Sequence, residues 1–386
     1  MKVGHSPGVR DALRQTGLPA LPPPRPRLAV YWLKALFGTP LNALISLALL
    51  WLLWFVLRLA ADWLFFQAVM SGGPEACKTA HGACWPFIAA KLRFIVFGVY
   101  PYDEHWRVFA ALVIIFLACS ISMMPRFWTR ALLALWAAVA ATLIILIRGG
   151  VFGLAYVPST LWSGLPLSII LSFVGFALGL PLGIALALAR ISPLPAISYI
   201  GTAIIEFARG VPLITILFMA SVMSPLFAPK SFTVDKLLSV QIALIVFIAA
   251  YVAETVRGGL LSIPQGQLEA ARSLGLGYWK MMRLVALPQA VARVLPALVT
   301  LFIAFFQDTT LVTIVGMLDF LSTVRAAMHD PNWQGIAVVE GYVLAGAVYL
   351  LISGVLGLYG RFLERIDLAK RRQQPSQPTA TSARTT

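Results

Sequence analysis

Charged residues are scarce in this 386-residue chain: Asp, Glu, Lys and Arg make up 12% of it, against 60% for hydrophobic residues. The mean hydropathy of +0.86 lies far outside the range of soluble globular domains. The apolar residues fall in continuous runs near the ~20 residues that a helix needs to cross a bilayer, and they do not alternate as the strands of a membrane barrel do. The composition therefore excludes a soluble domain and predicts an all-α polytopic membrane protein.

Motifs that hold nucleotides, metals or catalytic groups are missing as well. No G-x-x-x-x-G-K-[ST] stretch is present, so the chain lacks a phosphate-binding loop of that type. The four histidines are isolated, without an H-E-x-x-H pair, and no Ser-His-Asp set stands at usable spacing. We therefore expect no catalytic residue, no metal site and no cofactor in this chain.

Hydropathy predicts about eight transmembrane helices. The fourth carries Gly175, Gly179 and Gly183, a small-xxx-small ridge that allows close helix packing, either within the subunit or at a dimer seam. The predicted spans are 42–61, 108–124, 131–147, 165–189, 211–227, 238–255, 291–306 and 337–358.

The distribution of charge orients these spans. With an inner N-terminus, the inner segments collect 21 Lys and Arg against 6 Asp and Glu, while the outer loops collect 8 of each. Arg58 and Glu340 lie inside spans and complete the totals of 30 and 15. The whole net charge of +15 then lies on the inner face, as the positive-inside rule requires. We therefore expect both termini in the cytoplasm, and we attribute the basicity to topology rather than to a nucleic-acid partner.

Composition divides the chain at a seam near residue 160. Residues 1–40 form a Pro-rich basic stretch expected to be a disordered cytoplasmic arm, and 361–386 form a basic cytoplasmic tail. Between them, 41–160 hold three spans with a long outer loop at 62–107, and 161–360 hold five spans.

The chain has only three cysteines, and Cys77 and Cys84 bracket the stretch CKTAHGAC in the outer loop. They can form a disulfide if that side is oxidising, as a bacterial periplasm is, or remain two unpaired thiols.

The pattern E-x-x-R-G occurs twice at inner span ends. Glu206 precedes Arg209, and Glu254 precedes Arg257. At this spacing on a helix, a carboxylate and a guanidinium can pair on one face. The pairs are then either local ion pairs at the membrane edge or the lining of an inner gate.

Residues 262–290 form a polar inner loop that interrupts the apolar pattern. The stretch QLEAARSL favours a helix, Gly275 and Gly277 end or bend it, and a second helical piece runs to Pro288. Such a hairpin is too polar to cross the membrane, and its apolar stripe of Leu268, Ala271 and Leu274 predicts docking into a partner groove.

This loop resembles the EAA loop of ABC importer permeases. Its spacing E-A-A-x3-G-x9-[IV]-x-L-P is matched at every fixed point by Glu269, Ala270, Ala271, Gly275, Val285, Leu287 and Pro288. The stretches AAYVAETVRGGLLSIPQGQLEAARSLGL, EFARGVPLITILF and FFQDTTLVTIVG resemble the polar amino acid uptake subfamily, of the histidine and glutamine type. The N-terminal third, with GACWPFIAAK and YPYDEHWR, resembles the longer permease of general L-amino acid transporters of Gram-negative bacteria.

The resemblance implies a five-helix type I ABC importer core preceded by three extra helices, in a bacterial inner membrane. It implies two separate ATPase subunits that bind ATP and Mg²⁺, a second, paralogous permease, and a periplasmic binding protein that delivers an amino acid. Glu269, Ala270, Ala271, Gly275, Leu287 and Pro288 would be the ATPase-coupling positions. The rival hypothesis is a secondary amino acid transporter that works without an ATPase, which would show inverted repeats that this chain lacks.

An imported amino acid needs polar partners along its path, because neither its carboxylate nor its ammonium crosses lipid bare. Asp308 is either such a partner or the cap of the helix that follows it. Glu340 is a second acid within a span, with either a pathway role or an arginine partner across the bundle. The candidate pathway or gate residues are Glu206, Arg209, Glu254, Arg257, Asp308, Thr309, Thr310 and Glu340.

Overall fold

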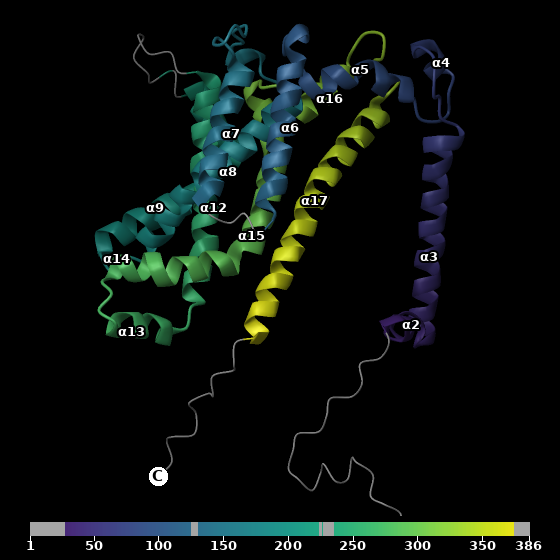
Figure 1. Ribbon diagram of the computed structural model, residues 1–386. Coiled ribbons are helices and arrows are strands. Elements are labelled where there is room, and N and C mark those ends of the chain that lie inside the picture. Colours follow the sequence, from purple (N-terminus) through teal and green to yellow (C-terminus); the bar gives the residue numbers. More distant parts are fainter. Residues whose placement is uncertain (1–27, 125–129, 224–225, 227–234, 374–386) are drawn as a thin grey trace, which may run out of the picture. The chain divides into compact units, whose positions relative to one another are not determined.

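A computed structural model of the chain describes residues 28–124, 130–223, 226 and 235–373 (Figure 1). Its contacts divide the chain into two units, Met1–Ala68 and Val69–Thr386. In the described residues there is no β-strand, only isolated bridges that join Val69 to Cys84 and Gly164 to Asp319. The predicted all-α fold is confirmed.

The first unit is an elbow of two helices, α2 (Leu28–Phe37) and α3 (Pro40–Ala61), followed by a π-helical turn, η1 (Asp62–Phe66). The side chain of Thr39 accepts a hydrogen bond from the Asn42 amide, and Pro40 fits the first turn of α3 because no partner is needed there for its missing N–H. The Ser46 hydroxyl donates to the Leu36 carbonyl at 2.8 Å, which fixes α2 against α3.

The second unit holds the other helices. Its core is the pair α8 (Gly164–Arg190) and α12 (Lys236–Leu261), which pack along their length. A Cβ on Gly179 would lie 2.3 Å from Cγ2 of Ile248, and one on Gly183 would lie 2.6 Å from Val252. The predicted glycine ridge therefore packs within the subunit, because only glycine allows α12 to approach this closely. The remaining helices are α4 (Pro74–Lys78), α5 (Trp85–Phe97), η2 (Tyr102–Glu104), α6 (His105–Ser122), α7 (Arg130–Arg148), η4 (Ser159–Leu161), α9 (Pro195–Gly210), α10 (Leu213–Phe218), η5 (Met219–Met223), α13 (Gln265–Ser273), α14 (Tyr278–Met281), η6 (Met282–Ala286), α15 (Leu287–Asp308), η7 (Thr309–Val315), α16 (Phe320–Met328) and α17 (Val338–Gln373).

Six helical segments of the described residues are long and apolar enough to cross a membrane, and α9 with α10 and η5 adds a seventh if that bent pair is one span. The predicted span 211–227 corresponds to α10 and η5, and residues 224–225 and 227 lie outside the described residues. The chain bends by 101° between α9 and α10, where Pro212 follows the end of α9. The predicted span 131–147 corresponds to α7, of which the apolar part Ala134–Arg148 is shorter than a full span.

Three predicted boundaries differ from the structure. Residues 28–37 of the predicted disordered arm form α2, because LAVYWLKALF is apolar and helix-forming, while residues 1–27 lie outside the described part. The tail predicted from residue 361 begins within α17, which continues to Gln373. The seam falls at Ala68 rather than near residue 160, because α5, from the predicted outer loop, buries Phe87 and Ile95 against α16 and contacts α8 and α17.

Candidate functional site

The last turns of α12 carry the centre of a charged network. The Glu254 carboxylate accepts from the Arg257 guanidinium, with Nη2 to Oε2 at 3.0 Å and Nε to Oε1 at 3.1 Å. The predicted i,i+3 ion pair therefore forms at this copy of E-x-x-R-G.

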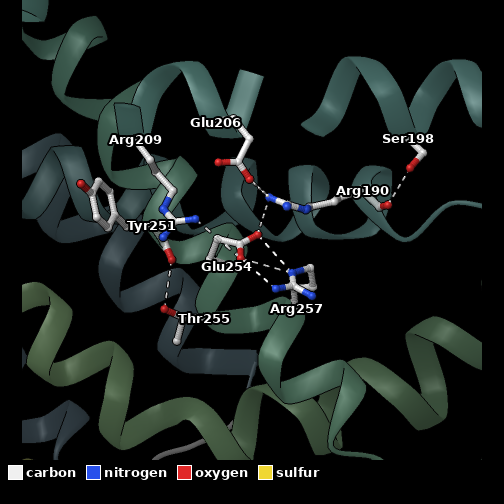
Figure 2. A network of polar contacts seen from close by, with 8 residues as sticks. All are labelled: Arg190, Ser198, Glu206, Arg209, Tyr251, Glu254, Thr255 and Arg257. Atoms are coloured by element: carbon white, nitrogen blue, oxygen red, sulfur yellow. Dashed lines mark hydrogen bonds and ion pairs between the residues drawn. The ribbon is translucent and has the colours of Figure 1, made fainter. Parts of the chain in front are cut away.

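Two further helices bring charges to Glu254 (Figure 2). Arg190, the last residue of α8, places its Nη1 at 2.8 Å from both the Glu254 Oε1 and the Glu206 Oε1 of α9. Arg209 of α9 lies 3.6 Å from the Glu254 Oε2. Three arginines and two glutamates thus join α8, α9 and α12 and leave an excess of 3 − 2 = one positive charge.

Local packing fixes this arrangement. The Ser198 hydroxyl donates to the Arg190 carbonyl at 2.8 Å, which holds the start of α9 against the end of α8. The Arg209 guanidinium lies 5.6 Å from the Tyr251 ring centre, a cation–π distance. The Glu254 side chain is only 18% exposed. The Glu254 carboxylate thus has three guanidinium neighbours and links the helices that carry them.

Sequence reasoning found four of these five residues and missed Arg190. The predicted Glu206–Arg209 pair is not among the ion pairs of the described residues, because α9 turns Glu206 towards Arg190 and Arg209 towards Glu254. The available signal was an arginine immediately after the predicted span 165–189.

Helix α13, the first helix of the predicted hairpin, is separated from the end of α12 by three residues. Helix α13 ends in a Schellman motif, in which the Leu276 amide donates to the Ala271 carbonyl and the Gly275 amide to the Arg272 carbonyl. Gly275 adopts φ +74°, and a Cβ there would meet nothing within 4 Å. The turn thus requires glycine for its backbone conformation and not for space.

The hairpin buries one edge and exposes the other. Ala271 is 4% exposed and packs into the core with the half-buried Leu268, while Glu269 and Ala270 face outward. Leu274 is 81% exposed, so it does not share the buried edge of Leu268 and Ala271 as the predicted stripe required. The reason is that α13 stops at Ser273, and the turn carries Leu274 away from the core.

The chain after the turn runs without a break from α14 through η6 into α15, so Pro288 lies in the first turn of α15 instead of ending a helix. Leu287 packs against the core. Arg293 of α15 donates to the Ser262 carbonyl and lies 3.0 Å from its hydroxyl, which ties α15 to the segment that enters α13.

Asp308, Thr309 and Thr310 lie where α15 passes into the 3-10 turns of η7. Asp308 makes no side-chain hydrogen bond at the start of η7, so its predicted capping role is wrong, because its backbone stays helical there. Thr309 is fully buried, and its hydroxyl donates to the Phe306 carbonyl at 2.7 Å. Asp308 remains as a partly buried carboxylate beside the core.

Glu340 lies in the first turn of α17 and is 4% exposed. Its Oε1 accepts from the Cys84 amide at 2.7 Å, so among the described residues its partner is a backbone N–H and not an arginine. Cys84 is joined to Cys77 by a disulfide. The structure thus assigns Glu340 to the attachment of α17 to the loop before α5.

Further contacts hold this end of the second unit together. The Lys91 ammonium of α5 lies 2.6 Å from the Asp330 carboxylate, and this hydrogen bond holds the pKa of Asp330 below its usual value. Asp319 accepts from the Leu321 and Ser322 amides and thereby caps α16. Burial raises the pKa of Asp319, while its hydrogen bonds with Ser322 and the two amides act in the opposite direction. Figure 1 shows α5 and α16 at the end of the unit opposite α13.

Several known proteins are similar in sequence to much of this chain. Residues 179–365 match the family described as "Binding-protein-dependent transport system inner membrane component". The chain is 42% identical over 355 residues to the inner membrane amino-acid ABC transporter permease protein YhdY of Escherichia coli, covering 89% of this chain and 95% of that one. It is 33% identical to the glutamate/glutamine/aspartate/asparagine transport system permease protein BztC of Rhodobacter capsulatus, covering 87% of this chain and 93% of that one.

Among solved structures, the crystal structure of an amino acid ABC transporter with histidines matches 54% of this chain and 92% of that chain, with 28% identity and a TM-score of 0.46. The family match and the 42% identity along nearly the whole length decide the assignment. The chain belongs to the binding-protein-dependent transport system inner membrane components, as an ABC transporter permease.

Proposed function

We propose that this chain is the membrane-spanning permease of an ATP-driven importer that takes up L-amino acids. A periplasmic binding protein delivers the amino acid, and two separate ATPase subunits bind and hydrolyse ATP. A second, paralogous permease completes the membrane channel. The names of the relatives, both amino-acid permeases, support this substrate class.

The observation that carries the proposal is the exposed hairpin built on α13. It presents Glu269 and Ala270 outward, holds Leu274 and Trp279 at 81% and 72% exposure, and is braced behind by Ala271. Exposed apolar side chains beside a carboxylate need a partner groove with a basic rim. A neighbouring ATPase subunit supplies that groove, which places the α13 end in the cytoplasm.

The charged network around Glu254 acts in this proposal as the inner gate. It joins the ends of α8, α9 and α12, and α12 leads through Ser262 directly into α13. A movement of α13 therefore reaches the three helices that the network connects. The amino acid passes Asp308 and Thr310, whose carboxylate and hydroxyl can meet its ammonium.

The test is Glu269→Lys in the assembled complex, reconstituted with the binding protein. We expect ATP-driven amino acid uptake to fall to the level without ATP, because the reversed charge meets the basic rim of the groove. The chain should still insert and purify with its partner permease. The control is Glu364→Gln, at an exposed position of α17. Uptake by Glu269→Lys at the normal rate, or transport by this chain alone without ATP, would favour the secondary transporter.

A further inference from the structure

A cavity of about 200 Å³ lies at the N-terminal end of α12, and neither the charged network nor the hairpin uses it. It is enclosed by η4, by the first residues of α12 and by the segment after η7, and Thr160, Lys236 and Gly316 line it. Because α12 has 26 residues, about 39 Å of helix separates this end from the end that leads to α13. The cavity therefore opens at the opposite side of the membrane from the hairpin.

One wall of the cavity is held by tight backbone contacts. The Ser163 hydroxyl, buried in this wall, accepts from the Val99 amide at 2.8 Å and donates to the Phe97 carbonyl at 3.1 Å. The Gly164 amide donates to the Leu318 carbonyl at 2.8 Å, and a Cβ on Gly164 would lie 2.2 Å from the Val96 carbonyl oxygen. These contacts keep the cavity open as a formed space with a fixed wall.

Lys236 supplies a positive charge to the cavity. It has no ion pair within 4.0 Å among the residues that the structure describes. Its ammonium lies 3.4 Å from the position of a Cβ on Gly316, above the backbone of the cavity lining. The adjacent Asp235 carboxylate is already engaged by the Leu238 amide at 3.1 Å and by the Ser159 hydroxyl. A lysine at the first residue of a helix is also disfavoured by the helix dipole, so this ammonium is available to an anion.

The cavity connects along one element with the deeper candidate residue. Gly316 ends η7, and Asp308 directly precedes its first residue. The seven residues of η7 rise about 2.0 Å each in 3-10 geometry, so η7 spans about 14 Å between Asp308 and Gly316, the residue beside the Lys236 ammonium. A cation at the mouth and an anion deeper inside suit the two charged groups of an amino acid, which carries a carboxylate and an ammonium.

We propose that this cavity is an entry site that binds the carboxylate of an incoming amino acid through the Lys236 ammonium and the Thr160 hydroxyl. Release from Lys236 then lets the ammonium of the amino acid advance to Asp308. This inference rests on the proposed import function, and it assigns a binding step to the end of the permease that faces the binding protein.

The experiment introduces a thiol into the cavity lining by Val99→Cys, in a Cys119→Ser background, within the assembled complex in lipid nanodiscs. The Val99 side chain is 42% exposed, so a methanethiosulfonate reagent can reach the new thiol, and both proposed ligands, Lys236 and Thr160, are kept. The probes are L-glutamine and 4-aminobutanamide, which is the same molecule without its carboxylate. We expect L-glutamine to slow the reaction about fivefold, as displacement by a charge-assisted contact implies, and 4-aminobutanamide to leave it unchanged.

Variants of the cation then identify its role. Lys236→Gln should abolish the protection by L-glutamine, and Lys236→Arg should retain it because the charge remains. Lys78→Gln is the matched control, since it removes a positive charge that pairs with Glu75 outside the cavity. Equal protection by both probes, or protection that survives Lys236→Gln, would overturn the entry site.

ATP-driven uptake measured on the same preparations separates this inference from the function on which it rests. Normal uptake without protection by L-glutamine would contradict the entry site alone. Absence of ATP-driven uptake by the parent complex, with protection intact, would contradict the importer and leave a carboxylate-binding cavity.

Discussion

At the scale of single residues, Glu254 decides the behaviour of the charged network. Its carboxylate lies within 4.0 Å of Arg190, Arg209 and Arg257, and among the described residues only Arg190 of these three pairs with a second acid, Glu206. Removing one guanidinium leaves the carboxylate paired, whereas removing the carboxylate leaves three guanidinium groups with one acid. Glu254 is therefore the position in the network at which replacement by an uncharged residue has the greatest effect.

Glu254→Gln keeps the size of the side chain and removes its charge. We expect the substitution to destabilise the protein by about 1.5–3 kcal/mol, the usual contribution of hydrogen bonds to charged groups. It should also loosen the coupling between ATP turnover and uptake. Thermal unfolding in detergent measures the first effect, and the ratio of ATP hydrolysed to amino acid imported measures the second. The control is Glu364→Gln, which replaces an exposed glutamate and should change neither quantity. Equal melting temperatures for the two variants would contradict the role of Glu254 in the network.

At the scale of elements, the turn after α13 and the cap of α16 show two ways in which short segments depend on one residue. Gly275→Ala places a side chain at φ +74°, which costs about 1 kcal/mol without any steric contact. We expect this variant to fold and insert but to bind the ATPase subunits more weakly, measured by their recovery with the purified permease. Gly266→Ala is the control, because Gly266 lies in the same helix without a positive φ. Equal recovery for both variants would show that the turn does not control docking.

Asp319, which caps α16, makes the stability of the protein depend on pH. Burial raises the pKa of Asp319 in the folded state, so its ionised form costs stability at neutral pH. That cost is relieved as the pH falls through the raised pKa, and it is absent below the unfolded value of about 3.9. Asp319→Asn lacks this titration. As the pH falls from 7 to 4.5, the melting temperature of the parent should therefore rise relative to that of Asp319→Asn.

Asp330 serves as an internal control, because its pKa is shifted in the direction opposite to that of Asp319. The hydrogen bond from Lys91 lowers the pKa of Asp330 in the folded state. The ionised carboxylate therefore stabilises the protein at a pH above its pKa in the unfolded state, and this stabilisation is lost as the pH falls through the lowered pKa of the folded state. The parent and Asp330→Asn should then keep a constant difference between pH 7 and 4.5 and converge only at lower pH. If the melting temperature of the parent instead rises relative to that of Asp319→Asn as the pH increases, the assignment for Asp319 is contradicted.

At the scale of the whole molecule, the sequence predicts what depends on local pattern, and it fails where distant segments meet. The apolar runs, the glycine ridge and the turn at Gly275 are each encoded within a few residues, and the structure contains them. Arg190 and the Cys84 amide, which is the partner of Glu340, became visible only when helices far apart in sequence were placed together. The division at Ala68 was missed for the same reason, since α5 reads as a loop segment until its contacts with α8 and α16 are known.

The disulfide tests the proposed orientation of the whole chain with residues that it already contains. If the end opposite α13 faces the periplasm, Cys77 and Cys84 lie in an oxidising compartment, and both should resist alkylation unless a reductant is added. Cys119, partly buried within α6, should react only after unfolding, and this reaction is the control for the reagent.

In cells that lack periplasmic disulfide oxidation, Cys77 and Cys84 should both become reactive. Mass analysis of the alkylated protein from the two kinds of cell measures this. Reactive thiols at both positions in normal cells would place this end in the reducing cytoplasm, and the net positive charge would then lie on the outer face.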